Sequence, residues 1–167
     1  MSETTPLSGD RVKVTVVVQV EPAVAFEVFT EEVDLWWRRG PKYRFGGRSP
    51  GVLEFEPGAG GRLFERFDDP ESPRVFEVGR ITAWEPPARL VFEWRGPNFK
   101  PGERTEVEVR FEPYPTGTRV ILEHRGFRAL RPDHPVRHGL ESAAFIRMMG
   151  LWWGELMSTL RERIASR

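Results

Sequence analysis

The sequence of 167 residues contains no cysteine. This absence excludes a disulfide framework, a thiolate nucleophile and a cysteine metal site. It is consistent with a reducing, cytoplasmic setting, which we expect for this chain. Long apolar runs are missing too, since no stretch approaches the ~20 apolar residues of a membrane span. The opening residues, MSETTPLSGD, carry no apolar signal-peptide core.

An excess of charge of either sign is also absent. The chain has 25 basic and 25 acidic residues and a formal net charge of zero. No global attraction therefore draws it to nucleic acid or to an anionic membrane. We expect no nucleic-acid partner and no membrane span.

Two common site motifs are missing. The glycine-rich stretch Gly58–Gly61 lacks the Gly-Lys-[Ser/Thr] ending of a phosphate loop and does not lead into a helix. No Gly-x-Ser-x-Gly nucleophile elbow exists. The sequence therefore predicts no cofactor.

Alternating and helical patterns divide the chain into elements. Valines alternate with more polar residues from Val12 to Val20, which predicts a strand with one buried face. Residues 22–37 favour two short helices with a break near Thr30, because Pro22 can occupy a first helical turn. Residues 40–51 are rich in glycine and proline and indicate a loop. About six further strands follow, at residues 52–56, 62–67, 74–84, 89–95, 105–113 and 118–126.

The last segment carries the strongest helical pattern. Apolar residues recur every four positions, at Leu140, Ala144, Met148, Trp152, Leu156, Leu160 and Ile164. Asp133 or His134 can cap the start, with Pro135 in the first turn. We expect a helix of roughly thirty residues, about 45 Å long. Trp152 should then face the sheet and Trp153 should reach a flank.

Together these elements predict an α+β fold of two layers. A curved antiparallel sheet of six to seven strands should carry the long C-terminal helix across one face, with two short helices near the N-terminus. We expect residues 1–10 to form a disordered tail and residues 11–167 to form a single domain.

Six motifs in this order suggest a family. They are Pro22, Phe26, Phe29 and the Trp36–Trp37 pair; Gly60–Gly61; GRITAWEPPARLVFEW; TEVEVRF; GTRVILEHRG; and Trp152, Leu156 and Leu160. From Val12 to Ile164 the chain resembles the START-like, or helix-grip, superfamily. Within it, the chain is similar to the C-terminal domain of the family named after the activator of the ninety-kilodalton heat-shock chaperone's ATPase. The resemblance implies a stand-alone domain without the activator's separate N-terminal domain, so we do not expect chaperone activation to carry over.

The resemblance implies a cavity between the sheet and the long helix, where helix-grip proteins bind small apolar molecules. Phe145, Met148, Met149 and Trp152 would form its roof, and Phe64, Phe76, Phe92, Trp94 and Phe111 its floor. Trp36 and Trp37 would close its mouth, with one ring buried and the other at the rim. Alternatively, these side chains simply fill the interior, and a closed interior would argue against a carrier.

Candidate polar groups are few. His124 shares a strand face with Val120 and Leu122, so it could bind a ligand or act as an acid or base, or it could be a satisfied buried histidine. Glu77 is an ambiguous candidate base. Glu65 and Glu93 are expected to face water. His134 and His138 are spaced like zinc ligands, but Pro135 keeps them from sharing a helical face, so we expect no metal.

Three functions remain open. The first is a stand-alone domain that binds an apolar or amphipathic small molecule without chemistry of its own. The second is a cyclase- or dehydratase-like enzyme that uses His124 or Glu77. The third is an interaction module, in which exposed Trp36 and Trp37 contact a chaperone or a second copy of the chain. The basic residues Arg38, Arg39, Lys42 and Arg44 are expected to balance Glu31, Glu32 and Asp34.

Overall fold

The computed structural model describes residues 11–45, 51–96, 98–131, 133–135 and 142–167. The predicted tail, residues 1–10, and His138 lie outside this part. The elements, in chain order, are β1 (Arg11–Val18), α1 (Pro22–Glu31), α2 (Val33–Trp36), β2 (Val52–Phe55), β3 (Arg62–Phe67), β4 (Arg74–Glu85), β5 (Arg89–Trp94), β6 (Thr105–Tyr114), β7 (Gly117–Arg125), the 3-10 turn η1 (Phe127–Ala129) and α3 (Ser142–Ala165).

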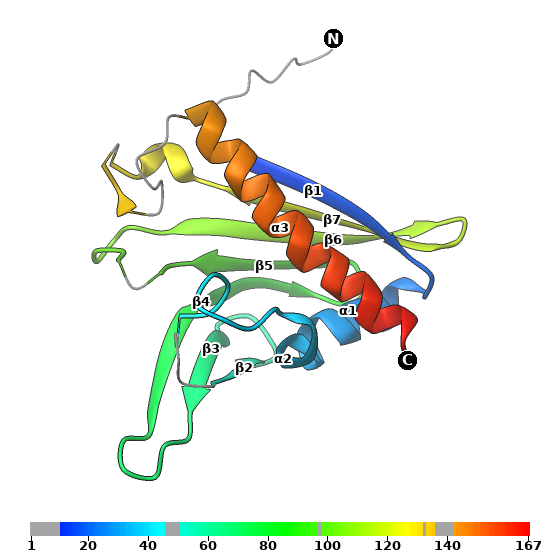
Figure 1. Ribbon diagram of the computed structural model, residues 1–167. Helices are drawn as coiled ribbons and strands as arrows, with labels where there is room; N and C mark the ends of the chain where they lie inside the picture. Colours follow the sequence, from blue (N-terminus) through cyan, green and yellow to red (C-terminus); the bar gives the residue numbers. More distant parts are fainter. Residues whose placement is uncertain (1–10, 46–50, 97, 132, 136–141) are drawn as a thin grey trace.

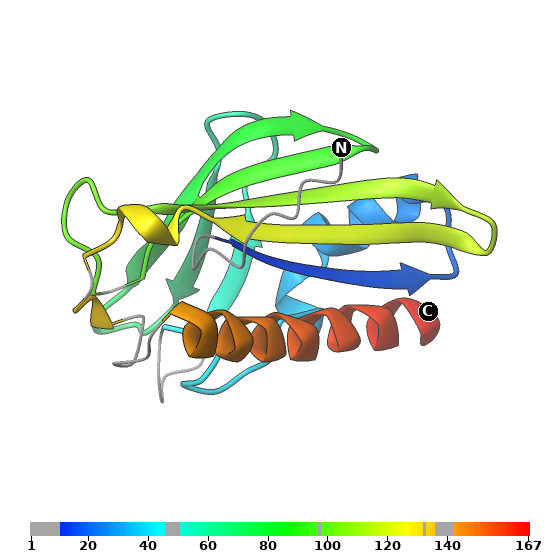
Figure 2. The same cartoon turned by 90° about the horizontal axis from the view of Figure 1, so that it is seen from above.

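The sheet and the long helix form the two layers that the sequence predicts. Seven antiparallel strands run in the order β1-β7-β6-β5-β4-β3-β2, so β1 and β2 are the edges. Helix α3 lies across the sheet over β1, β7 and β6 (Figure 1), and the view from above separates the two layers (Figure 2). The short helices α1 and α2 connect the two edge strands and pack against the same inner face. The helix-grip fold is confirmed.

Alternation along the strands decides which side chains reach the interior. In β6 the buried positions are Thr105, Val107, Val109 and Phe111, as the period-two pattern predicts. In β7 the inner face carries Thr118, Val120, Leu122 and His124, and Ile121 of the opposite face is buried as well. Opposite partners carry this face across the sheet, since His124 pairs with Val12 of β1 and Val107 of β6. His124 therefore sits in the middle of an apolar layer.

The buried face of α3 differs from the predicted one. The buried residues are Phe145, Met149, Trp153, Leu156, Met157, Leu160 and Ile164, whereas Met148 and Trp152 are only partly buried. A strict four-residue repeat rotates by about 40° at each step, because 3.6 residues make one turn. The expected stripe therefore drifts off the sheet, and the expectation that Trp152 faces the sheet while Trp153 lies at the flank is wrong: the two roles are exchanged.

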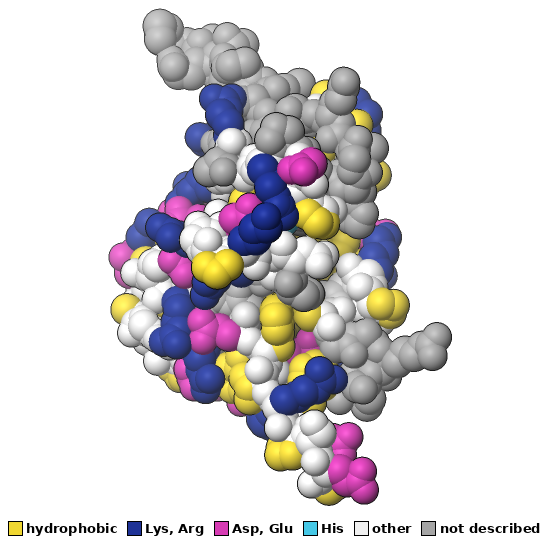
Figure 3. Space-filling view, turned by 90° about the vertical axis from the view of Figure 1, so that its left-hand side faces the viewer, with side chains coloured by type: hydrophobic (Ala, Val, Ile, Leu, Met, Phe, Trp, Pro, Cys, Tyr) yellow, Lys and Arg dark blue, Asp and Glu magenta, His cyan; other side chains and the backbone are white. Residues whose placement is uncertain are grey.

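Ion pairs cover the outer face of the sheet. Arg125 pairs with Glu106 at 2.6 Å, Glu108 at 2.8 Å and Glu123 at 2.9 Å, while Arg89 pairs with Glu108 at 2.5 Å. Charges of both signs are also interspersed on the side of the molecule shown in Figure 3. Within the described residues, no helix is both long and apolar enough to cross a membrane.

The sheet bends where β4 carries an extra residue. Leu63 pairs with Gly79 and the next residue, Phe64, pairs with Glu77, so Val78 is the inserted residue of a β-bulge. Gly79 lies against the neighbouring strand, because a Cβ atom there would be only 1.6 Å from the carbonyl oxygen of Glu93. The close approach of β4 to β5 thus requires a glycine.

We expect Gly79→Ala to lower the free energy of unfolding by about 3 kcal/mol or more, because the main chains of β4 and β5 must separate. The matched control is Gly150→Ala in α3, where a new Cβ meets no atom within 4 Å. That change should raise the free energy of unfolding by about 0.5–1 kcal/mol. Urea titrations measure both. Equal, small effects would contradict this account of the bulge.

Candidate functional site

Five of the six tryptophans gather in one cluster under α3: Trp36, Trp37, Trp94, Trp152 and Trp153. Trp37 stacks on Trp94, with ring centroids 5.9 Å apart and planes 17° apart. Trp153 meets Trp37 edge-on at 5.6 Å, and Trp152 meets Trp94 edge-on at 5.7 Å. This tryptophan cluster joins the sheet, α3 and the segment after α2. Each such ring pair contributes about 0.5–1.5 kcal/mol beyond its buried area.

The Trp36–Trp37 pair is buried as a whole, which corrects the expectation of one buried ring and one rim ring. Trp36 is 0% exposed and Trp37 is 3% exposed. Helix α2 ends at Trp36, and Trp37 adopts an extended conformation. The two side chains are therefore not helical neighbours and can both turn inward. Their indole N–H groups donate to the carbonyl oxygens of Phe29 (3.1 Å) and Tyr43 (3.0 Å).

A hydrogen-bonded chain runs through His124. The Trp153 indole N–H can only donate, so the His124 Nδ1 atom, 3.0 Å away, must accept. The proton of the neutral ring then lies on Nε2, which donates to Thr105 Oγ1 at 2.7 Å. The Thr105 hydroxyl donates in turn to the carbonyl oxygen of Trp94 at 3.1 Å. Both ring nitrogens are thus engaged, and burial lowers the pKa of His124 to about 3.

Residues 37–45, which we call the 37–45 segment, are fastened to α3. The Tyr43 hydroxyl donates to Glu155 Oε1 at 2.6 Å, and Lys42 Nζ lies 3.0 Å from the same oxygen. The Trp152 indole N–H donates to the Lys42 carbonyl oxygen at 2.8 Å, and Arg38 Nε donates to that of Glu155 at 3.0 Å. The hydrogen bond from Tyr43 lowers the pKa of Glu155 and raises that of Tyr43.

Arg44 holds the segment from the inside. Its guanidinium group donates to Asp34 Oδ1 at 2.6 Å and to the carbonyl oxygens of Trp37 (2.6 Å), Asp34 (2.9 Å), Arg38 (3.2 Å) and Gly51 (3.3 Å). These bonds use all five of its N–H donors. Burial alone would raise the pKa of Asp34, but bonds from Leu53 N–H and Arg44 lower it.

A small cavity remains beneath the 37–45 segment. Its volume is about 10 Å³, which is room for one water molecule. It is lined by Trp37, Tyr43, Arg44, Phe45, Leu53, Leu63, Glu65, Val78 and Trp94. The interior at this end is therefore closed by side chains rather than open at ligand size.

Glu65 corrects an expectation about β3. It is 1% exposed and lines the cavity together with Leu63, two positions earlier. Phe64, expected on the cavity floor, takes the opposite face of β3, with the Arg62 guanidinium 4.7 Å from its ring. Side chains still alternate along β3, but the Glu65 carboxylate lies on the inner face and not on the water-facing one that the sequence predicts.

Glu77 lies opposite Phe64 and so shares its outer face. It pairs with Arg80 at 3.0 Å and with Arg95 at 3.6 Å. The direction of Glu77, which the sequence left ambiguous, is therefore outward. Glu93 is partly buried and lies 3.3 Å from Arg104.

The other expected lining residues lie on the inner face but not around one space. Phe111 packs on Phe26 of α1 at 5.2 Å, and Phe92 packs on Phe55 of β2 at 5.4 Å. Phe76 meets Phe45 at 5.0 Å beside the cavity. Phe145 packs on Phe127 of η1 at 4.9 Å, and Met148 and Met149 contact the core nearby. Only Trp37 and Trp94 of the expected set line the small cavity itself.

Sequence reasoning missed several residues of this site: Tyr43, Phe45, Glu65, Thr105 and Trp153. A signal existed for Trp153, since Phe145, Met149, Trp153, Leu156 and Leu160 follow the helical spacing of four, four, three and four. Tyr43 and Phe45 lie in an irregular loop whose path no periodicity predicts.

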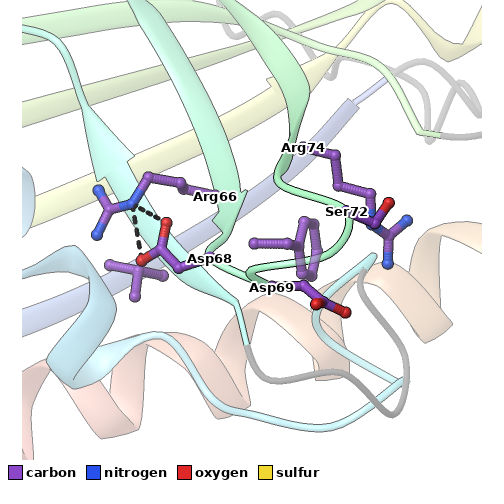
Figure 4. A pocket seen from close by; sticks show the side chains of 7 residues that line it. Arg66, Asp68, Asp69, Ser72 and Arg74 are labelled. Carbon is purple, nitrogen blue, oxygen red and sulfur yellow. Dashed lines mark hydrogen bonds and ion pairs between the residues drawn. The ribbon is translucent and has the colours of Figure 1, made fainter.

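A wider hollow lies at the ends of β2, β3 and β4, outside the tryptophan cluster. It measures about 560 Å³ and is lined by Val52, Arg66, Phe67, Asp68, Asp69, Ser72 and Arg74. Figure 4 shows Arg66 bonded to Asp68, at 2.9 Å, on one side and Arg74 near Ser72 on the other. The Arg74 guanidinium lies 4.4 Å from the Phe67 ring. Arg66 and Asp68, two of the charged groups that line the hollow, thus form an ion pair with each other. In the part of the chain that the structure describes, no three His, Asp or Glu side chains gather as metal ligands.

Comparison with known proteins identifies the family of the chain. The profile of the family described as Activator of Hsp90 ATPase homolog 1-like protein matches residues 19–149. The chain belongs to this family. The match confirms the resemblance drawn from the sequence and covers most of the sheet and the first part of α3. A search of curated proteins found no match.

Solved structures share the fold at low identity. A Rhodobacter sphaeroides protein has a TM-score of 0.64 at 20% identity, over 96% of this chain and 95% of its own. Protein MLL2253 from Mesorhizobium loti has a TM-score of 0.61 at 19% identity, over 94% and 97%. Aha1 from Colwellia psychrerythraea, described as a dimer, has a TM-score of 0.58 at 13% identity, over 92% and 95%. These likenesses bear on the fold alone.

The hydrogen bonds of the buried His124 predict that the folded protein loses stability in acid. Below pH 6.5 the unfolded histidine takes up a proton that the folded protein binds only near pH 3, so falling pH favours unfolding. Between pH 6 and 4 this group should cost roughly 1.4 kcal/mol of unfolding free energy per pH unit. We expect His124→Asn to be less stable at pH 7 but to show a shallower pH slope. Urea titrations between pH 6 and 4 measure the unfolding free energy of both proteins. The carboxylates are the same in both, so their contribution to the pH dependence cancels in the comparison. Parallel slopes would contradict the prediction.

Proposed function

We propose that this domain binds a small apolar or amphipathic molecule between the sheet and α3, with the 37–45 segment as the wall that moves. The observation that carries the proposal is the position of the water-sized cavity. It lies directly beneath this segment, and Trp37, Phe45 and Trp94 wall it on the apolar side. Membership of the family supports a helix-grip interior but names no ligand.

The closed interior argues against a preformed carrier site, so binding requires the interior to open. Pockets that hold small molecules measure roughly 300–1,000 Å³, against about 10 Å³ here. Two of the rings that fill the space, Trp37 and Phe45, belong to the segment itself. Their outward movement would vacate volume next to Trp94 and Trp152, and an apolar ligand would cover the surface that they leave.

The attachments of the segment to α3 suit such a movement. Lys42 and Glu155 are 61% and 40% exposed at their side chains, and ion pairs at such exposure contribute little to stability. The firmer attachment is the buried Arg44, which anchors the end of the segment to Asp34. The segment therefore has one strong attachment and several weak ones along α3.

The alternatives fit the described residues less well. The predicted enzyme would use His124 or Glu77, but both nitrogens of His124 are engaged and Glu77 pairs with arginines on the outer face. The proposed interaction module needs an exposed Trp36–Trp37 pair, and both rings are buried. Self-association of this chain stays a prediction, for which a dimer mass in native mass spectrometry is the test.

We expect Glu155→Ala to speed the entry of an apolar probe. The change removes the partner of both Tyr43 and Lys42, so the open form becomes more populated. Stopped-flow mixing with the neutral fluorophore N-phenyl-1-naphthylamine, read by energy transfer from tryptophan, should show association several-fold faster than in the unaltered protein.

Glu162→Ala, on the exposed side of the same helix, is the matched control and should leave the association rate unchanged. Native mass spectrometry of the purified protein identifies any molecule that is retained. The proposed function would be abandoned if neither the unaltered protein nor Glu155→Ala bound the probe saturably.

A further inference from the structure

The 37–45 segment covers the interior with two rings that lie flat on rings of β5 and α3. Trp37 is stacked on Trp94 of β5, with ring planes 17° apart, and Tyr43 is stacked on Trp152 of α3, with planes 26° apart and centroids 6.0 Å apart. The three tryptophans of β5 and α3 instead meet one another edge-on, at 64–86°. Both flat contacts of this group therefore belong to the part of the wall that moves in the proposed function.

Three uncharged rings bound the place that the Trp37 indole occupies. Trp94 lies nearly parallel to it, while Trp152 and Trp153 stand nearly perpendicular, at 74° and 82°, with centroids 6.0 and 5.6 Å away. A flat aromatic ring suits such a place, because the faces and edges of aromatic rings carry opposite partial charge and favour both offset-stacked and edge-on contacts. A saturated ring or an acyl chain lacks this charge pattern and would gain only from burial.

Two of the bounding rings are held by groups outside the 37–45 segment. The Trp153 indole N–H donates to His124 at 3.0 Å, and the Thr105 hydroxyl donates to the main-chain carbonyl oxygen of Trp94 at 3.1 Å. When the segment moves outward, the face of Trp94 is left bare at a fixed position. A ligand that covers this face removes its apolar area from water again, which is favourable.

We propose that the ligand of this domain carries a flat aromatic ring system, which replaces the Trp37 indole on the face of Trp94 when the 37–45 segment moves outward. This inference rests on the proposed function and names the chemical class of its ligand. The water-sized cavity adjoins both rings, since Trp37 and Trp94 line it together. The ligand ring would therefore occupy the place of the indole together with the cavity next to it.

Two alcohols that share one carbon skeleton test the proposal: 2-naphthol and decahydro-2-naphthol. The first is flat and aromatic, and the second has the same two fused rings without aromatic bonds. Isothermal titration calorimetry at pH 7 measures their affinities for the unaltered protein. We expect 2-naphthol to bind about three- to tenfold more tightly than decahydro-2-naphthol, as one aromatic ring pair allows.

Trp37→Leu removes the ring that the ligand must displace and leaves the face of Trp94 uncovered. We expect this variant to bind 2-naphthol several-fold more tightly than the unaltered protein does, with a smaller gain for decahydro-2-naphthol. Phe26→Leu is the matched control and should change neither affinity. It removes another buried ring, which packs on Trp84 and Phe111, and none of these three residues lines the cavity.

The outcomes separate the two proposals. Equal affinity for both alcohols, or tighter binding of decahydro-2-naphthol, would overturn the aromatic ligand and leave the proposed function standing. This comparison in the unaltered protein needs no variant. A Trp37→Leu protein that is folded by thermal unfolding but gains no affinity for 2-naphthol would overturn it too. Failure of both alcohols to bind would also overturn the aromatic ligand, and the proposed function falls with it only if N-phenyl-1-naphthylamine fails to bind as well.

Discussion

The hydrogen-bonded chain from Trp153 through His124 and Thr105 to the Trp94 carbonyl joins the two layers of this protein. It connects α3 to β7, β6 and β5 through groups that have no access to water. Because the indole can only donate, the direction of every bond in the chain is determined. A charged His124 would place two donors face to face, so the closed interior requires a neutral ring. The tryptophan cluster packs around this chain, and the 37–45 segment contributes Trp37 to the cluster and packs on its other rings.

This arrangement separates a rigid part of the interior from an adjustable part. Around His124 the polar atoms are satisfied and the rings are fully buried, which makes movement there costly. Toward the 37–45 segment the attachments are ion pairs and a hydrogen bond at partly exposed side chains, and a water-sized cavity lies below them. A ligand site built on this fold would therefore open at the segment, while the sheet and the turn of α3 that carries Trp153 stay in place.

Much of the fold could be predicted from the sequence because strand alternation and turn chemistry are local. The seven strands, the break after α1 and the inward position of His124 follow from such patterns. The site could be predicted only in part. The expected face of β3 was wrong although the sequence carried a signal: Leu63 and Phe67 share the face of Glu65, whereas Phe64 lies between Arg62 and Arg66. The burial of the Trp37 ring depends on where α2 ends. The ion pair between Arg44 and Asp34 depends on tertiary structure.

The protonation state of His124 tests most directly whether a neutral ring joins Trp153 to Thr105. Nitrogen-15 NMR of the imidazole ring distinguishes a protonated Nε2 with a bare Nδ1 from the other neutral tautomer and from the cation. We expect a single neutral ring with the proton on Nε2, unchanged from pH 7 to pH 5, because burial lowers the pKa of His124 to about 3. A ring that titrates near pH 6.5, or one that carries its proton on Nδ1, would contradict it.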